Sequence, residues 1–218
     1  DRLYMVWREL PEYQIERAPV SYPTYLDVTQ SIAAFASAGV YTSAAATISV
    51  GGEPERIRGA RVSGALFATL GNVPLLGRVI MEGDDSPAAE PVIVLSSGLW
   101  HRQFGGSSDA LGRNVLIGET PHRVIGVMPD SFVFPSPQSE FWIPLQLSAT
   151  AEERDTHRFG MIARLTPGTS IDQASSQVDV LHAALLAEYP DIYSGRMWLE
   201  QRHDYLVGDA AGVLRALL

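Results

Sequence analysis

The stretch RFGMIARLTPGTSIDQASSQVDVLHAALLAEYP, residues 158–190, decides the fold class because a strand-like run leads directly into one clear helix. Ser170 occupies the expected N-cap and Gln173 follows three residues later, which is the spacing of a capping box. One helical stripe then continues to a stop at Pro190: Ile171, Ala174, Val178, Leu181 and Leu185. With RMWLEQR (196–202) as the next strand, the region predicts a strand–helix–strand unit.

The N-terminal part of the chain repeats this order of elements without repeating the sequence. Residues 3–7 indicate a short strand, and Ser21 before Tyr22 and Pro23 indicates an N-cap with proline in the first turn. The buried face of this helix is expected to hold Tyr22, Leu26, Thr29, Ala33 and Ala36. A period of two then predicts a strand near 40–50, with one face formed by Ala44, Ala46, Ile48 and Val50.

The middle of the chain has a different texture, with shorter elements between turns. Gly51 and Gly52 predict a tight turn into a polar strand, and Ser63 is expected to cap a short helix ending at Gly71. Residues 92–95 predict a buried strand that leads into a helix of about two turns ending near Phe104. Two further strands are expected over residues 113–128. The whole pattern predicts an α+β fold.

Composition excludes several classes of chemistry. The 218 residues contain no cysteine, and all 16 basic residues are arginine, so thiolate, Schiff-base and P-loop lysine chemistry are absent. The net charge of −9 argues against nucleic acid and against anionic lipid as partners. No run of about 18 apolar residues occurs. The apolar end GVLRALL (212–218) lacks a helix cap, so we expect more polypeptide to follow it.

The run VLSSG (94–98) raises the question of a serine nucleophile. A strand that leads into a serine and then a helix is how α/β-hydrolases present theirs, but the glycine that the elbow needs is replaced by Val94. Ser96 or Ser97 as a helix cap is the simpler interpretation, because a cap satisfies free N–H groups of the first turn.

The other polar groups have structural explanations that we prefer to functional ones. The five histidines, His101, His122, His157, His182 and His203, form no H-x-x-x-H pair for a metal. The acidic stretch 82–90 lacks the ligand spacing of a calcium loop and is expected to be solvated. Asp27 and Asp155 have no partner that the sequence identifies. The glycines at 71 and 77 are expected in turns, and four aromatic residues in a core edge or a protein contact: Phe132, Phe134, Phe141 and Trp142.

Five stretches, in order, resemble the MacB-type periplasmic core domain of FtsX-like ABC transporter permeases, most of all the large permeases abundant in acidobacteria. They are SYPTYLDV (21–28), GARVSGALFATLGNVPLLGR (59–78), VIVLSSGLWHRQFGG (92–106), DALGRNVLIGETPHRVIGVMPDSF (109–132) and FWIPL (141–145). The resemblance implies two porter-like strand–helix–strand units flanking an inserted smaller mixed α/β lobe. We expect residues 1–70 and 146–218 to form the discontinuous porter-like lobe, and residues 71–145 the inserted lobe.

The resemblance also implies a function without chemistry. It places the chain on the periplasmic side of a bacterial inner membrane, between two transmembrane helices, and implies no catalytic, cofactor-binding or metal-binding residue. The implied partners are those flanking helices, a second permease copy, a cytoplasmic ATPase and a periplasmic adaptor protein. The domain would relay ATP-driven conformational change across the membrane to move or release a substrate or to engage a partner.

Two other classes of function remain open from the sequence. An extracytoplasmic solute-binding or sensor domain would contain a closed pocket of several hundred cubic ångströms with converging polar groups. A serine hydrolase built on Ser96 or Ser97, the weaker of the two alternatives, would place a histidine within hydrogen-bonding distance of the serine.

Overall fold

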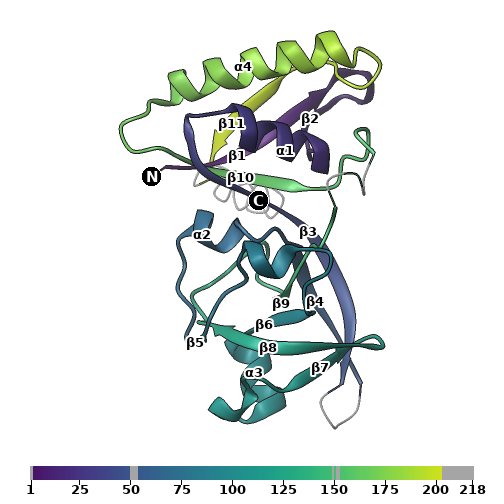
Figure 1. Cartoon of the computed structure of the whole chain (residues 1–218), viewed down its shortest axis with the longest axis vertical. Helices are drawn as coiled ribbons and strands as arrows, with labels where there is room; N and C mark the ends of the chain where they lie inside the picture. Colours follow the sequence, from purple (N-terminus) through teal and green to yellow (C-terminus); the bar gives the residue numbers. More distant parts are fainter. Residues whose placement is uncertain (1, 50–53, 149, 151–152, 203–218) are drawn as a thin grey trace, which may run out of the picture. The chain divides into compact units, whose positions relative to one another are not determined.

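The computed structural model describes residues 2–49, 54–148, 150 and 153–202, and the chain divides into two compact units. Unit 1 consists of residues 1–40 and 149–218, and unit 2 of residues 41–148. The chain contains both strands and helices and has an α+β fold, as the sequence predicts (Figure 1). Strand β3 (Phe35–Ser49) contains the boundary between the units.

Unit 1 is a sheet with two helices packed against it. Strand β1 (Leu3–Leu10) pairs antiparallel with β2 (Ile15–Ala18), β10 (Gly160–Leu165) and β11 (Met197–Gln201), and the short helix η1 (Pro11–Tyr13) links β1 to β2. Helix α1 (Tyr22–Ser31) contacts helix α4 (Ile171–Glu188), which packs against β11 (Figure 1). The two predicted helices therefore cover the sheet together.

Both helix starts confirm the capping predictions. The Thr24 N–H donates to Ser21 Oγ at 3.3 Å, and Ser170 and Gln173 form the reciprocal capping box. The predicted face of α1 was wrong at Leu26 and Thr29, because the buried residues are Tyr22, Thr24, Tyr25 and Val28. The helix ends at Ser31 and β3 begins at Phe35, so Ala33 and Ala36 cannot extend a helical stripe.

Unit 2 contains a closed ring of six strands, although nothing in the sequence indicates closure. The ring follows the order β3, β4 (Glu55–Val62), β9 (Ser139–Pro144), β6 (Val92–Ser96), β8 (Thr120–Met128) and β7 (Asn114–Ile117). Strand β7 then pairs with the end of β3, Ile48 opposite Ile117 and Ser49 opposite Leu116. A closed sheet leaves its strands no free edge.

Each strand of the ring contributes to one apolar core. The core residues are Ile48, Ile57, Ile93, Leu95, Leu99, Val115, Val124, Phe141 and Ile143. All come from the six strands except Leu99, which belongs to helix α3 (Ser97–Phe104). The predicted alternation of β3 is confirmed, because Ile48 lies in this core and Ala44 and Ala46 pack against it. Val50 and the predicted glycine turn lie outside the described residues.

The remaining elements of unit 2 are short. Helix α2 (Leu66–Leu70) ends at Gly71 as predicted, but its N-cap is Ala65 and not Ser63. Strand β5 (Leu76–Gly77) pairs with β8, and the short helices η2 (Glu82–Asp85) and η3 (Ser108–Ala110) lie in the connections. Four aromatic residues of unit 2 pack against one another in a cluster: Phe67, Phe132, Phe134 and Trp142. The Trp142 indole N–H donates to the Phe134 carbonyl at 2.9 Å.

The compact units differ from the predicted lobes mainly at the first boundary. The sequence placed residues 41–70 with the porter-like lobe, whereas in the structure they pack within unit 2. The physical reason is that β3 and β4 supply two of the six strands of the ring. The functional division into a porter-like lobe and an inserted lobe stays a prediction.

The pairing of β4 with β9 depends on glycine at position 59. A Cβ on Gly59 would lie 2.3 Å from the Phe141 carbonyl oxygen, and Phe141 is fully buried in the ring core. We expect Gly59→Ala to lower the free energy of unfolding by about 1–3 kcal/mol through overpacking, measured by urea denaturation.

Gly98→Ala is the matched control, because a Cβ on Gly98 meets nothing closer than 4.0 Å and the residue lies in helix α3. There we expect no loss, and up to about 1 kcal/mol of gain from helix propensity. Equal effects of the two substitutions would contradict the packing explanation.

Candidate functional site

Ser96 acts as a helix cap in the structure. It ends strand β6, and its Oγ accepts the Leu99 N–H at 3.1 Å. Its backbone angles, φ −71° and ψ 156°, are those of ordinary extended chain and carry no strain of the kind found in a nucleophile elbow. Ser97, the other serine considered, is buried at the first helical position.

The hollow beside these serines brings no histidine next to either of them among the described residues. It has a volume of about 210 Å³ and is lined by both serines, by Asp130 and Glu140 among others, and by no histidine among the described residues. Glu140 accepts a hydrogen bond from Arg102 at 2.7 Å. A serine nucleophile needs an adjacent base, and the described lining offers no imidazole for that role.

The four histidines in the described residues have different surroundings. His101 lies on the exposed surface of α3 against Trp100, with ring centroids 4.6 Å apart, and His122 on β8 contacts the Thr120 carbonyl at 3.0 Å. His182 is buried on α4, with Nε2 3.0 Å from the Gly195 carbonyl. No group of three or more metal-binding side chains occurs within residues 2–49, 54–148, 150 and 153–202. His203 lies outside them.

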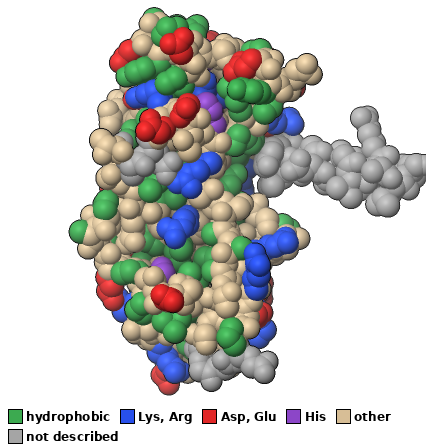
Figure 2. All heavy atoms as spheres, turned by 90° about the vertical axis from the view of Figure 1, so that its right-hand side faces the viewer, with side chains coloured by type: hydrophobic (Ala, Val, Ile, Leu, Met, Phe, Trp, Pro, Cys, Tyr) green, Lys and Arg blue, Asp and Glu red, His purple; other side chains and the backbone are tan. Residues whose placement is uncertain are grey.

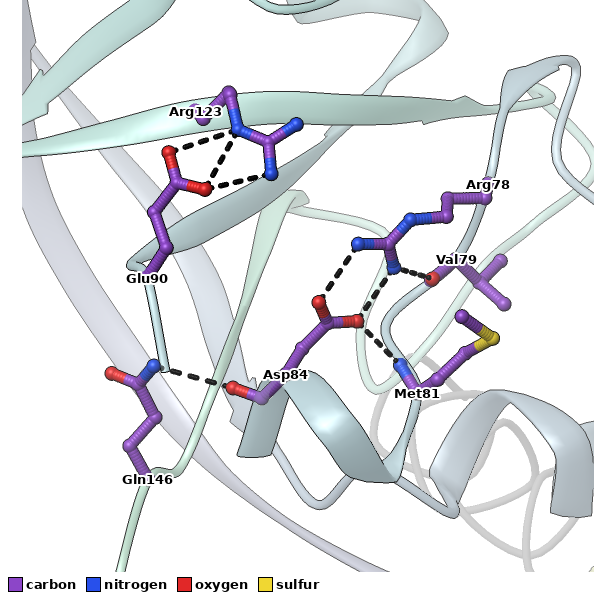
Figure 3. A network of polar contacts seen from close by, with 7 residues as sticks. All are labelled: Arg78, Val79, Met81, Asp84, Glu90, Arg123 and Gln146. Carbon is purple, nitrogen blue, oxygen red and sulfur yellow. Dashed lines mark hydrogen bonds and ion pairs between the residues drawn. The ribbon is translucent and has the colours of Figure 1, made fainter. Parts of the chain in front are cut away.

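The acidic stretch 82–90 is mostly exposed, as the sequence predicts, and two of its carboxylates also pair with arginines. Asp84 receives two hydrogen bonds from the Arg78 guanidinium, at 2.6 and 2.8 Å, and one from the Met81 N–H (Figure 3). These bonds from Arg78, together with the arginine's charge, hold the pKa of Asp84 below its usual range. Glu90 pairs in the same way with Arg123 on β8.

Asp85 ties the same stretch to the rest of unit 2. Its carboxylate accepts the Gly64 N–H at 2.9 Å and the Gln146 N–H at 2.7 Å, so it joins the start of the α2 region to the end of β9. The Gln146 side-chain amide in turn donates to the Asp84 carbonyl at 3.2 Å (Figure 3). Burial raises the pKa of Asp85, which is the expected effect of desolvation on a carboxyl group.

Unit 1 is organised around Arg8, a fully buried arginine on β1. Its guanidinium contacts His157 Nε2, donates to the Ile192 carbonyl at 3.1 Å and lies 4.3 Å from the centre of the Tyr193 ring. Its Nε has no partner among the described residues. Burial of a cation among neutral groups and an aromatic face carries a desolvation cost, which these contacts partly offset. Arg8 therefore fixes β1 to two loops that are far apart in sequence.

A second chain of contacts extends this network to α1. The Tyr193 hydroxyl lies 2.8 Å from Thr24 Oγ1, and the Arg154 guanidinium donates to the same hydroxyl at 3.1 Å. Arg154 also forms an ion pair with Asp27, the acidic residue for which the sequence identified no partner. The sequence analysis missed this network for two reasons. An arginine in a strand is expected on the surface, and the partners of Arg8 lie far from it in the sequence.

The largest hollow described in unit 2 lies on its surface and has a volume of about 490 Å³. Its lining combines small residues of β3 and β4 with a single guanidinium, Arg58, which donates to Gln138 at 3.1 Å. Because Ser43, Ala45, Arg58 and Gln138 are all exposed, the hollow is open to solvent. It differs from the closed pocket that a solute-binding domain would require.

The face of the molecule drawn in Figure 2 carries acidic, basic and hydrophobic side chains interspersed. None of the helices in the described part of the chain is long and apolar enough to span a bilayer. The polar networks described above join segments that are distant in the sequence within each unit.

Comparisons with known proteins identify the class. The sequence profile described as the MacB-like periplasmic core domain matches residues 1–181. That match covers more than half of the chain, so the chain belongs to this family. It is the periplasmic domain of a MacB/FtsX-like ABC transporter permease, as the resemblance in the sequence implied.

One curated relative is the probable export ATP-binding/permease protein MacB of Pseudomonas entomophila (strain L48), 26% identical over 112 residues. The alignment covers 50% of this chain and 17% of that protein, so the chain spans a small part of its relative.

Solved structures share the fold. The periplasmic region of MacB from Actinobacillus actinomycetemcomitans has a TM-score of 0.67 at 16% identity, covering 96% of this chain and 92% of that one. A domain of a putative permease protein from Porphyromonas gingivalis gives 0.69 at 16% identity, covering 92% and 89%. The extracellular domain of the noncanonic ABC-type transporter YknZ from Gram-positive bacteria gives 0.63 at 14%, covering 91% and 100%.

Removal of the Ser96 hydroxyl should affect stability and nothing else. We expect Ser96→Ala to lower the free energy of unfolding by about 1 kcal/mol, the usual value of an N-cap, because the Leu99 N–H loses its acceptor. Urea denaturation measures this loss, and a serine-reactive fluorophosphonate probe checks for nucleophilicity. Labelling of the unchanged chain that disappears in Ser96→Ala would contradict the cap assignment.

Buried histidines make stability depend on pH in the weakly acidic range. Burial lowers the pKa of His157 and of His182, and the neighbouring Arg8 charge lowers both further, against smaller raising effects of Asp155 and Glu12 on His157. Between the lowered folded pKa and the unfolded value of about 6.5, the unfolded chain binds more protons than the folded one. Stability therefore falls as the pH falls below about 6.5.

His157→Gln tests this dependence, since glutamine keeps a polar group beside Arg8 and does not titrate. We expect the urea midpoint to decline less steeply between about pH 7 and pH 5 in this variant than in the unchanged chain. Thr156→Ser, a conservative change at the neighbouring position, serves as control. Identical slopes in the His157→Gln variant and the unchanged chain would contradict the role of His157.

Proposed function

We propose that this domain is a mechanical relay: it transmits ATP-driven conformational change from membrane helices to the periplasmic side of the permease. The observation that carries the proposal is that each compact unit has its own cross-linking network, centred on Arg8 in unit 1 and on the closed ring of unit 2. A body that transmits displacement must deform less than the connections between bodies.

The partners in this proposal follow from family membership. They are the transmembrane helices of the same permease, a second permease copy, a cytoplasmic ATPase and a periplasmic adaptor protein. The movement would push or release a substrate, or engage a partner, and the domain itself would carry out no bond-making chemistry. The support is the family match over residues 1–181 and the structural chemistry of the polar groups described above.

A solute-binding or sensor domain is the second candidate, because the hollow beside Arg58, with a volume of about 490 Å³, is large enough for a small solute although it is open to solvent. In that case, conformational change would follow the addition of a solute. The relay predicts instead that conformation follows the nucleotide state of the ATPase. The two functions can therefore be separated in one experiment on the full-length permease.

Spin labels can measure this movement, since residues 1–218 contain no cysteine and single cysteines can be introduced cleanly. We expect the distance between labels at Tyr13 in unit 1 and Val73 in unit 2, both strongly exposed, to differ between nucleotide-free and ATP-trapped permease. Pulsed dipolar spectroscopy on the full-length permease with its ATPase, after replacement of any cysteine outside the domain, gives these distances.

The matched control is a pair of labels within unit 2, at Val73 and Leu116, whose distance should stay constant between the two states. Equal Tyr13–Val73 distances in both nucleotide states would contradict the relay. A change that follows an added solute and not the nucleotide would favour the sensor.

A further inference from the structure

The outer surface of α4 is unusually apolar for an exposed helix. The helix carries only three charged residues, Asp172, Asp179 and Glu188, over its 18 positions. Its buried side is formed by Ala174, Val178, His182 and Leu185, yet Val180 on the opposite side is 72% exposed. Five of the ten exposed positions of α4 are apolar, Val180, Ala183, Ala184, Leu186 and Ala187, whereas the exposed side of a surface helix is usually polar. Among the described residues, nothing covers this apolar part of the outer surface.

The residues at the centre of this surface are small. At 100° per residue, the middle line of the exposed side is formed by Ser176, Val180, Ala183, Ala184 and Ala187. Small side chains at spacings of three and four residues leave grooves into which the ridges of a second helix can pack closely. We call these five residues the α4 outer face.

A groove borders the α4 outer face on the side of α1. It has a volume of about 260 Å³ and is lined by Ser31 of α1 and by Gln177, Val180, Leu181 and Ala184 of α4. Leu181 is half-buried and Val180 is exposed, so the groove offers apolar surface with uncharged polar groups at its ends. It can accept apolar side chains that project from a partner lying along α4.

The other border of the α4 outer face is acidic. Asp172 and Asp179 lie on this side, about 80–100° around the helix from Val180, and both are exposed. No basic residue other than the buried His182 occurs on α4, so an incoming cation meets no like charge from this helix.

We propose that the α4 outer face binds an amphipathic α-helix of a partner protein, with an apolar ridge in the α1–α4 groove and basic residues beside Asp172 and Asp179. An extended peptide would leave its backbone groups unpaired, because α4 uses its own N–H and C=O groups internally, whereas a helix satisfies its own. The inference concerns unit 1 alone and stands whether or not the relay function holds.

Charge decides against the other occupants. A second copy of α4 offers no exposed basic residue that could pair with Asp172 and Asp179. Anionic lipid headgroups would meet the same carboxylates. Opposite charges flanking an apolar contact provide selectivity, because like charges at that position are unfavourable.

The test uses residues 1–218 and synthetic helical peptides with a row of leucines on one side, read by fluorescence anisotropy. The first peptide carries arginine along one flank, the second glutamate at the same positions, and the third serine in place of the leucines. We expect the first to bind, and the second and third to bind at least about tenfold more weakly.

Variants of the chain locate the binding surface. Val180→Arg should weaken binding of the arginine-flanked peptide about tenfold or more, whereas Val73→Arg, at an equally exposed valine of unit 2, should leave it unchanged. Ala187→Arg repeats the test on the same face, and circular dichroism checks that each variant is folded. Asp179→Asn should weaken binding and reduce its dependence on salt, in contrast to Asp109→Asn at an exposed site of unit 2.

Three results would overturn the proposal. One is equal binding of the arginine-flanked peptide by Val180→Arg and by the unchanged chain. The second is self-association in sedimentation equilibrium that Val180→Arg abolishes, which would assign the face to a second copy. The third is co-sedimentation with anionic phospholipid vesicles that Val180→Arg abolishes, which would assign it to a membrane surface.

Discussion

The pairing of β7 with the end of β3 is the interaction on which unit 2 depends. Ile48 lies opposite Ile117 and Ser49 opposite Leu116, and these contacts turn a succession of six strands into a closed ring. Without them the sheet would have two free edges, and the apolar residues of its strands would have no common interior. With them, every strand contributes to one core, capped by Leu99 of α3. To open such a ring, the hydrogen bonds between two paired strands must be broken.

Unit 1 is held together by a different kind of contact. Its sheet is covered by two helices, and the strongest constraint is polar: a fully buried arginine whose contacts reach His157, Ile192 and the Tyr193 ring. The energetic cost of leaving that charge without partners holds β1 and two loops in one arrangement. Strand β3 belongs to both units, with residues 35–40 in the first and 41–49 in the second.

Sequence reasoning succeeded where the signal is local. The caps at Ser21, Ser96 and Ser170 are confirmed, because a hydroxyl three residues before a free N–H forms its bond whatever surrounds the helix. It failed where burial depends on a distant neighbour. The buried side of α1 shifted from Leu26 to Tyr25 and Val28, since α4 and Phe159 decide which side is covered. The acidic stretch is mostly exposed, as expected, but the sequence did not identify the arginines that pair with Asp84 and Glu90.

By itself, the sequence determined the α+β class, the helices and most strands, and the absence of cysteine and lysine chemistry. Caps, periodicity and turn residues act over a few positions, so the helices and strands that they favour can be predicted from the sequence. Only the tertiary structure decided that six strands close into a ring, that residues 41–70 join unit 2, and that Asp27 pairs with Arg154 across 127 positions. Contacts of that kind are selected by the packing of the whole chain, and nothing in the neighbouring residues records them.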